Sequence, residues 1–476
     1  MAALATMTNK LRTGAALIAG AAAAEASRRL GRGGGTALPG LVAATIAPDI
    51  TAQLVRRAGA GTVVVTGTNG KTTTAHLLAE CARAAGSEVI ANRSGSNLER
   101  GIVSAFLADR GNGARGRLGV LEVDEAALPP LLPALAPRAI VFLNLFRDQL
   151  DRYGEVDSVA EGWERMLIAD ASGATLVLNA DDPSIAPLGD AARGEVVTFG
   201  IEDDGIARDG PDHASDARFC RCGAPFRYDA IFVAHAGRWR CDACGRSRPR
   251  PLVAAHEIEQ FEDGSRFVLD LAGERIEVEL PLQGLYPIYN ALGAAAAAHA
   301  LGLVAPVVAG ALAGAGPAFG RQERFQLRGR ELRLWLAKNP AGMNAVLRAL
   351  TAAGTAAGEA PQPRLQILAA LNDGIQDGRD VSWIYDADFE LLAGHAASVC
   401  VTGDRADDLA LRLRLAGVRV DLVQPHRASA LDEALHRLPP GERLEVITTY
   451  TAMLQLREII AAGSGVAPYW ERERQR

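Results

Sequence analysis

One glycine-rich run combines a lysine with three threonines, residue types that together can bind phosphate. Residues 67–74 read Gly-Thr-Asn-Gly-Lys-Thr-Thr-Thr and fit the pattern G-x-x-G-K-T-T, a shortened form of the common phosphate-binding loop. Glycines let backbone N–H groups turn toward phosphate oxygens, the lysine neutralises the outer phosphates, and a threonine hydroxyl can ligate Mg²⁺. The run therefore predicts an ATP site that includes Gly67, Asn69, Gly70, Lys71, Thr72 and Thr73.

Acidic residues follow a strand-like run further along the chain. Glu122, Asp124 and Glu125 come directly after the apolar residues 118–121. A carboxylate at the carboxyl end of a parallel strand faces the ligand crevice of an α/β sheet, and Mg²⁺ prefers oxygen ligands. Taken alone, such an acid is more often a solvated loop charge. Together with the phosphate-binding loop, Glu122 is the predicted magnesium ligand.

Four of the six cysteines lie within a short stretch, as Cys220-x-Cys222 and Cys241-x-x-Cys244. Four thiolates can enclose a tetrahedral Zn²⁺ and leave no open position, so the predicted zinc is structural. The glycine after each pair allows the tight turn that points thiolates inward. Free thiols without metal are the alternative. A nucleic-acid role is a further alternative, because seven arginines surround the cluster, at positions 221, 227, 238, 240, 246, 248 and 250.

The elements around these residues predict an α/β protein. Residues 62–66 are β-branched and apolar, the loop follows at once, and residues 75–85 are typical of a helix, so strand, loop and helix come in the order that a phosphate-binding loop requires. Further apolar runs at 118–122, 139–143 and 174–178 have room for helices between them. Residues 265–271 and 275–280 alternate as a hairpin, and 289–303 favour a helix. A second set of strands is predicted at 365–371, 397–402 and 444–448.

Length and composition place these elements in a multidomain globular chain. The 476 residues are 49% hydrophobic and 22% charged with a net charge of -6, which shows no bias toward nucleic acid. We expect a helical segment at 1–55, an ATP-binding domain at 56–324 with the cysteine insertion near 216–250, and a C-terminal α/β domain at 325–476. Residues 14–24 are apolar but too short to span a bilayer. They predict a helix packed on the first domain of a cytoplasmic protein, with peripheral membrane contact as the alternative.

The loop and several further motifs resemble the Mur ligases, which extend the stem peptide of peptidoglycan. Residues 66–74 match the ATP loop of that superfamily, and other matching motifs cover most of the first two domains: 92–97, 144–154, 178–183, Tyr289-Asn290 and 320–324. Within the superfamily the chain resembles the MurT family, through residues 338–342, residues 372–383 and the inserted cysteine cluster. The resemblance implies a Mur ligase-like P-loop central domain with an inserted zinc ribbon and a C-terminal Rossmann-like α/β domain.

The resemblance assigns roles residue by residue. Lys71 and Thr72 would hold phosphates and Mg²⁺, Glu122 the metal, Asn290 the adenine side, and Arg321 the phosphates. It implies ATP-dependent amidation of the α-carboxyl of D-glutamate in the lipid II stem peptide, through an acyl phosphate attacked by ammonia. The ammonia is implied to come from a GatD-like class I glutaminase, a separate chain whose histidine a carboxylate of this chain would orient. Asp380 is the favoured carboxylate and Asp377 the second, since spacing does not separate them.

The sequence departs from the pattern of these relatives in three places. Residues 153–168 contain no lysine, although amino-acid-adding Mur ligases carry a carbamylated lysine in that region. Lys338 stands where those relatives have an acidic residue, and Cys220-Arg-Cys222 is one residue shorter than the C-x-x-C of related ribbons. Cys81 and Cys400 fall inside a predicted helix and strand, so neither is expected to be a glutaminase nucleophile. The alternatives are a self-sufficient Mur-like ligase that adds an amino acid, and a zinc-ribbon binding protein that uses ATP as a switch.

Overall fold

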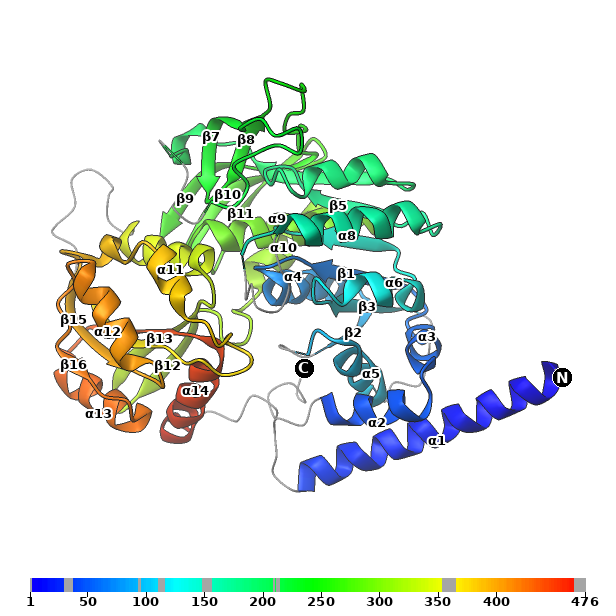
Figure 1. The fold of residues 1–476 in the computed structure, drawn as a ribbon, viewed down its shortest axis with the longest axis horizontal. Helices are drawn as coiled ribbons and strands as arrows, with labels where there is room; N and C mark the ends of the chain where they lie inside the picture. Colours follow the sequence, from blue (N-terminus) through cyan, green and yellow to red (C-terminus); the bar gives the residue numbers. More distant parts are fainter. Residues whose placement is uncertain are drawn as a thin grey trace.

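The described part of the protein has two large β-sheets, each covered by helices on both faces, and one small two-stranded sheet (Figure 1). The computed structural model describes residues 2–29, 37–92, 96–109, 116–147, 156–208, 210, 215–352 and 365–465. The predicted motif residues 93–95 and 148–154 lie outside this set. The element bounds given below refer to the described residues.

The first sheet has nine strands in the order β11-β10-β9-β6-β5-β4-β1-β3-β2. Strands β1 to β6 and β9 pair in parallel, whereas β10 pairs antiparallel with both β9 and β11. The parallel part and the hairpin of β10 and β11 confirm the predicted arrangement. The strands are β1 (Thr62–Thr66), β2 (Glu88–Ala91), β3 (Arg117–Glu122), β4 (Ala139–Phe142), β5 (Thr175–Asn179), β6 (Val196–Ile201), β9 (Val253–Phe261), β10 (Gly264–Leu271) and β11 (Glu274–Leu280).

Helices cover the first sheet on both faces because its strands are apolar on both sides. One face packs against α4 (Lys71–Ala84), α9 (Leu285–Ala300) and α10 (Ala305–Gly314). The other face packs against α3 (Ile50–Val55), α5 (Glu99–Ala108), α6 (Leu128–Leu135) and α8 (Val156–Ala169). In α9 the side chains of Ala291 and of residues 294–298 have no exposed surface. These methyl groups let the helix lie close against the sheet and α4.

Two helices begin at earlier residues than the sequence predicted. The helix predicted at 75–85 begins at Lys71, because the threonines of the phosphate-binding loop already form its first turn. The helix predicted at 289–303 begins at Leu285 and ends at Ala300. Pro287 lies in its first turn, where the missing N–H has no intrahelical partner to lose.

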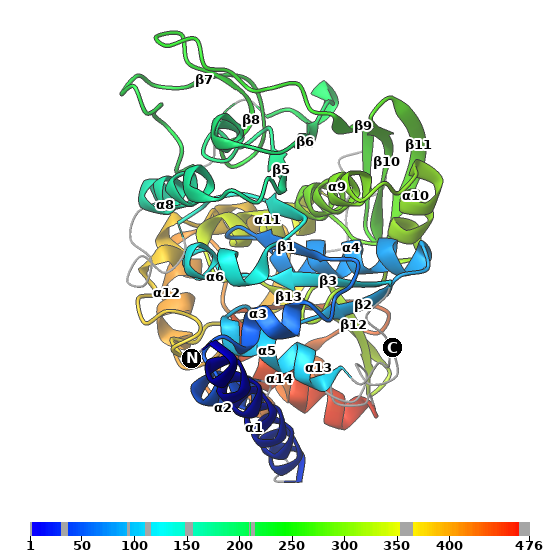
Figure 2. The same cartoon turned by 90° about the vertical axis from the view of Figure 1, so that its right-hand side faces the viewer.

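The N-terminal residues form α1 (Ala2–Arg29), which lies along α2 (Leu38–Ile46) at one side of the first sheet (Figures 1 and 2). Ala16 is fully buried, and a Cβ at Gly20 would lie 2.8 Å from Leu107 Cδ1, so this face of α1 packs closely. Leu11 and Ile18 on the outer face are exposed. Within the described part of the chain, no helix is both long and apolar enough to cross a membrane.

The second sheet has six strands in the order β12-β13-β17-β14-β15-β16, all parallel except the β12–β13 pair. They are β12 (Glu323–Leu327), β13 (Arg330–Leu336), β14 (Leu365–Ala370), β15 (Ala396–Thr402), β16 (Leu422–Val423) and β17 (Arg443–Thr448). α11 (Pro340–Ala352) and α12 (Ala406–Leu415) cover one face, and α13 (Arg427–Arg437) and α14 (Tyr450–Ser464) cover the other. Since β12 begins at Glu323, the predicted boundary at residues 324/325 falls just inside this strand.

Candidate functional site

The phosphate-binding loop connects β1 to α4 and fits closely around two asparagines. Asn69 N–H donates to Asn144 Oδ1 (2.8 Å), and Thr68 N–H donates to the Asn144 carbonyl (3.0 Å). Gly70 has φ +91°, and a Cβ there would lie 2.0 Å from Asn290 Oδ1. A side chain at position 70 would be strained by its backbone angle and would also collide with Asn290. The local geometry therefore requires glycine at position 70.

Lys71 places its ammonium group inside the loop. Its Nζ donates to the Gly67 carbonyl (2.5 Å) and to Glu125 Oε2 (2.9 Å). Burial opposes the charge, but Glu125 and Glu122 more than compensate, so the pKa of Lys71 is raised above its usual value. Lys71 is a fixed positive charge. Glu125 was not among the predicted site residues, although it stands in the same acidic run as Glu122.

Thr72 and Glu122 bring two oxygen atoms that could bind a metal ion together at the start of α4. Thr72 Oγ1 donates to Glu122 Oε2 (2.9 Å). The Asn92 side-chain amide holds the Glu122 backbone, because its Nδ2 donates to the Glu122 carbonyl and its Oδ1 accepts from the Glu122 N–H (2.8 Å each). Burial raises the pKa of Glu122, opposed by Lys71, Thr72 and Arg321. A hydroxyl and a carboxylate beside a phosphate-binding loop are a suitable donor set for Mg²⁺.

A cavity of about 410 Å³ begins at the loop and extends between the two sheets. Lys338 lines it, together with five of the predicted nucleotide residues: Asn69, Gly70, Thr73, Asn290 and Arg321. Among the described residues, Asn290 Oδ1 and Arg321 Nε have no hydrogen-bond partner although both atoms are buried. Burial lowers the pKa of Arg321, opposed by the nearby Glu122. Unpaired buried polar atoms at a cavity wall indicate groups that await a ligand.

The second sheet contributes directly to this cavity. Asn69 and Asn339 exchange two side-chain hydrogen bonds (3.3 and 3.1 Å), so the loop contacts residues 338–342 at the end of β13. The nine predicted nucleotide residues thus form one connected cluster, through the Lys71–Gly67 and Thr72–Glu122 hydrogen bonds, the Glu122–Arg321 electrostatic contact and the shared cavity wall.

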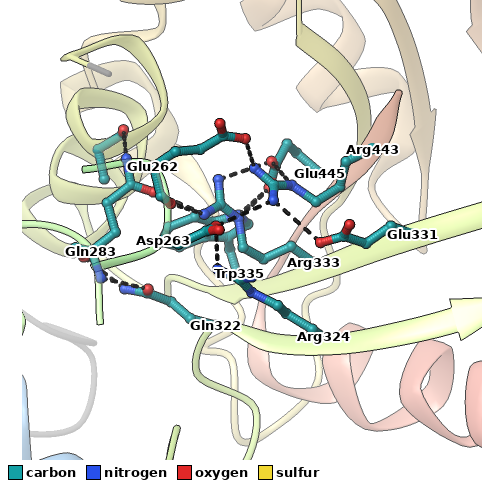
Figure 3. Close-up of polar contacts among 11 residues, drawn as sticks. Glu262, Asp263, Gln283, Gln322, Arg324, Glu331, Arg333, Trp335, Arg443 and Glu445 are labelled. Carbon is teal, nitrogen blue, oxygen red and sulfur yellow. Dashed lines mark hydrogen bonds and ion pairs between the residues drawn. The ribbon is translucent and has the colours of Figure 1, made fainter. Parts of the chain in front are cut away.

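A buried polar cluster joins the two sheets beside the cavity, and we call it the inter-sheet clamp (Figure 3). Arg333 on β13 pairs with Glu445 on β17 through two bonds (3.0 and 2.9 Å) and also donates to the Glu262 carbonyl and Gln283 Oε1. Trp335 Nε1 donates to Glu445 (2.6 Å), and Arg443 pairs with both Glu445 and Glu262. Because these residues are far apart in the chain, the sequence patterns did not reveal the clamp.

The four clustered cysteines converge at the base of the β-ribbon formed by β7 (Arg227–Val233) and β8 (Ala236–Arg240). All four sulfur atoms lie within 4.8 Å of one another, with Cys220–Cys244 at 3.6 Å and Cys222–Cys241 at 3.5 Å. Tetrahedral Zn–S bonds of about 2.3 Å require S···S distances of about 3.8 Å. Gly223 and Gly245 have φ of +86° and +77°, as the predicted turns require. The residues fit a zinc ion.

The arginines around the cysteines are mostly paired with carboxylates. Six of the seven form such ion pairs: Arg221–Glu164, Arg227–Asp242, Arg238–Glu202, Arg240–Asp229, Arg246–Asp190 and Arg248–Asp181. Paired arginines present little net positive charge to a phosphate backbone. This pairing disfavours the nucleic-acid interpretation of the ribbon.

The ribbon is anchored on the segment after β5. Asp181 accepts hydrogen bonds from Arg248 (2.6 Å) and from the Tyr289 hydroxyl (2.6 Å), and it is fully buried. His235, in the turn between β7 and β8, is also buried, with Nε2 3.4 Å from Asp182. Motif 178–183 therefore connects the ribbon to the residue before Asn290.

Asp377 and Asp380 have different environments, which spacing alone did not separate. Asp377 is buried and accepts from the Thr451 N–H (2.9 Å) and hydroxyl, so it caps the start of α14. Asp380 is exposed, and its bonds from Ser382 lower its pKa. Ile375 and Tyr385 nearby are exposed as well, whereas Trp383 is partly buried against the core. Of these two carboxylates, Asp380 is therefore accessible at the surface, whereas Asp377 is buried in a contact with α14.

Cys81 and Cys400 are buried in α4 and β15, as predicted. Burial raises the pKa of Cys81 to about 12 and also raises that of Cys400. Neither thiol is suited to nucleophilic attack, because the reactive form is the thiolate.

Comparison with known proteins gives consistent results along the chain. Residues 65–219 match the model of the Mur ligase middle domain, and residues 336–453 match that of the MurT ligase C-terminal domain. The chain is 34% identical over 403 residues to the lipid II isoglutaminyl synthase (glutamine-hydrolyzing) subunit MurT of Staphylococcus aureus, covering 84% of this chain and 87% of that one. It is 32% identical to the subunit of the same name from Streptococcus pneumoniae, covering 95% and 98%.

Solved structures share the fold. A pseudomurein peptide ligase type C from Methanothermus fervidus superposes with a TM-score of 0.62 at 24% identity, covering 84% of this chain and 78% of that one. The MurF ligase of Thermotoga maritima in complex with ADP gives 0.59 at 15% identity, covering 89% and 84%. The Mur ligase fold predicted from the motifs is confirmed.

Proposed function

Since the chain belongs to the MurT family of Mur ligase-like proteins, we propose that it is the synthetase subunit of a lipid II isoglutaminyl synthase. The reaction is ATP-dependent amidation of the D-glutamate α-carboxyl in the lipid II stem peptide. The observation that carries this proposal is the cluster of nine nucleotide residues, in which Lys71 and Glu122 contact the phosphate-binding loop and Arg321 lines the adjoining cavity. The substrate would be met at the inner face of the membrane.

In the first step, a carboxylate oxygen of the substrate attacks the γ-phosphorus of ATP, and ADP leaves. Lys71 neutralises the negative charge on the phosphates from within the loop, and Arg321 approaches from the second side of the cavity. Thr72 and Glu122 would hold Mg²⁺, which supplies further charge neutralisation when bound. The protein thus positions the reactants and stabilises developing charge.

In the second step, ammonia attacks the acyl carbon of the acyl phosphate, inorganic phosphate leaves, and the amide forms. This chain offers no activated cysteine among its described residues outside the metal cluster, so glutamine hydrolysis requires a partner of the GatD-like class I glutaminase type. We assign Asp380 to the partner's active site, where it would orient the catalytic histidine. The buried, helix-capping Asp377 is not suited to that role.

The test compares two ammonia sources in the purified complex. Asp380→Asn should lower glutamine-dependent amidation by roughly 10³- to 10⁴-fold, because the orienting carboxylate is lost. Amidation with free ammonium chloride should stay at the wild-type rate. Asp373→Asn, in the same loop and paired with Arg405, is the matched control.

Three outcomes would each contradict part of the proposal. If the wild-type chain with ATP, lipid II and ammonium forms no amide, the synthetase assignment is wrong. If Asp380→Asn retains glutamine-dependent activity, another residue orients the histidine. Transfer of an amino acid in place of ammonia would instead support the self-sufficient ligase, which the names of the curated relatives do not favour.

We further propose that Cys220, Cys222, Cys241 and Cys244 bind a structural zinc. Elemental analysis of the purified protein should give one zinc per chain, and Cys241→Ser should lower both zinc content and thermal stability. Cys400→Ser serves as the thiol control and should keep the zinc, since Cys400 lies in β15 away from the cluster. A protein purified without zinc, yet as stable as after zinc addition, would contradict the proposal.

A further inference from the structure

Arg321 lies in a turn whose backbone is unusual on both sides. Gly320 has φ +70° and Gln322 has φ +56°, so the residues before and after Arg321 are both left-handed. Glycine adopts this conformation readily, but glutamine does so at a cost. The Arg321 N–H donates to the Ala318 carbonyl (3.0 Å), which closes the turn. Other contacts must hold Gln322 in its unfavourable conformation.

The Gln322 side chain supplies these contacts. Its Oε1 accepts from the Gln283 N–H (2.9 Å), and its Nε2 donates to the Gln283 carbonyl (2.7 Å), as Figure 3 shows. One side-chain amide thus pairs with both backbone groups of a single residue, in the manner of a strand neighbour. The two bonds together fix the direction in which the turn presents Arg321.

Gln283 is itself held on the buried network between the sheets. Its Nε2 donates to the Ala349 carbonyl (2.6 Å), and its Oε1 accepts from Arg333 Nη1 (2.9 Å). Gln283 is only 3% exposed and Arg333 only 2%. Gln322 therefore connects the Arg321 turn to the inter-sheet clamp, and Gln283, Arg321 and Gln322 all line the same cavity.

The other side of the turn is supported by α14. The Gly320 N–H donates to Glu323 Oε2 (3.0 Å), and Glu323 pairs with Arg457 of α14 (2.7 and 2.9 Å). A Cβ at Gly320 would lie 2.8 Å from Met453 Cε, so the helix packs directly against the turn. With α14 behind and Gln322 beside it, the turn directs the Arg321 side chain toward Glu122 and the cavity.

We propose that Gln322 is a positioning residue of the nucleotide site, which holds Arg321 in the orientation that binds the phosphates by pairing with the Gln283 backbone. The proposal rests on the proposed function, because it takes the cavity to be the ATP site. Gln322 does not need to touch the nucleotide. Its effect passes through Arg321.

The experiment measures MgATP affinity by isothermal titration calorimetry in the full chain. Gln322→Gly removes both hydrogen bonds and relieves the backbone strain, so it isolates the side-chain contacts; it should weaken MgATP binding about tenfold. Gln322→Asn tolerates the left-handed conformation but is one methylene shorter, and it should give a smaller loss. Gln326→Ala, an exposed glutamine on β12, is the matched control and should bind as wild type does.

A double-mutant cycle separates positioning from a general structural role. In an Arg321→Ala background, Gln322→Gly should cause little further loss of affinity, since the residue through which it acts is already gone. Additive losses, or wild-type affinity in Gln322→Gly, would overturn the proposal. If wild-type protein fails to bind MgATP, the proposed function fails instead. Circular dichroism of each variant confirms folding, and Gln322→Asn keeps the test decisive if Gln322→Gly does not fold.

Discussion

The nucleotide cluster and the inter-sheet clamp both bury charged groups between the same two sheets, but they differ in how completely these groups are hydrogen-bonded. In the clamp, Arg333 donates from Nε and both terminal nitrogens, and Glu445 accepts from Arg333, Trp335 and Arg443. In the nucleotide cluster, the buried Asn290 Oδ1 and Arg321 Nε have no hydrogen-bond partner among the described residues. A complete network stabilises the fold, whereas an incomplete one is available to a ligand.

The largest expected effect on stability tests the clamp. Arg333→Met should lower the free energy of unfolding by about 3 kcal/mol, because it leaves Glu445 buried with part of its hydrogen bonding lost. Chemical denaturation measures the change. Arg330→Met on the same strand is the control and should stay within about 0.5 kcal/mol. A loss below about 1 kcal/mol for Arg333→Met would show that the clamp does not stabilise the protein.

The next effect tests the nucleotide cluster. Lys71→Met should lower the rate of ATP-dependent amidation by about 10²- to 10³-fold, because the phosphates lose a preorganised positive charge. Amide formation is followed with saturating ammonium. Because the variant leaves Glu125 buried without its partner, a double variant with Glu125→Gln separates lost activity from lost stability. Arg83→Met, an exposed residue of α4, should be active. A wild-type rate in Lys71→Met would show that the lysine does not contribute to catalysis.

The smallest effect concerns the pH dependence of stability. Burial raises the pKa of Glu122 above its ordinary 4.5, so the native state keeps a proton that the unfolded chain releases first. The contribution of Glu122 to stability is therefore greatest below pH 4.5 and is lost as the pH rises through the raised value. Glu122→Gln should remove this loss and make the ligand-free protein more stable than the wild type at pH 8, because a neutral amide does not have to be buried as a charge. Unfolding measured from pH 4.5 to 8 tests it. Equal pH profiles for both proteins would contradict the raised pKa.

The sequence predicted the features that depend on neighbouring residues, but not the contacts between residues that lie far apart in the chain. The phosphate-binding loop, its flanking strand and helix, and the hairpin of β10 and β11 depend on neighbouring residues, so periodicity and spacing were sufficient. Asp377 and Asp380 belong to one polar loop, and only the fold shows that one of them caps α14. Gln283, Arg333 and Glu445 are brought together by tertiary packing, which no local pattern encodes. The same is true of Gln322.

The alanines of α9 limit how this protein can vary. The alanine-rich composition is consistent with a general bias of the genome, yet Ala291 and residues 294–298 have no exposed surface, so each methyl group occupies its space fully. A larger side chain would push α9 away from the sheet, and with it Tyr289 and Asn290 at the helix start. Random mutagenesis should therefore recover few substitutions in this helix among active variants. Close packing of α9 against the sheet therefore requires small side chains at these positions.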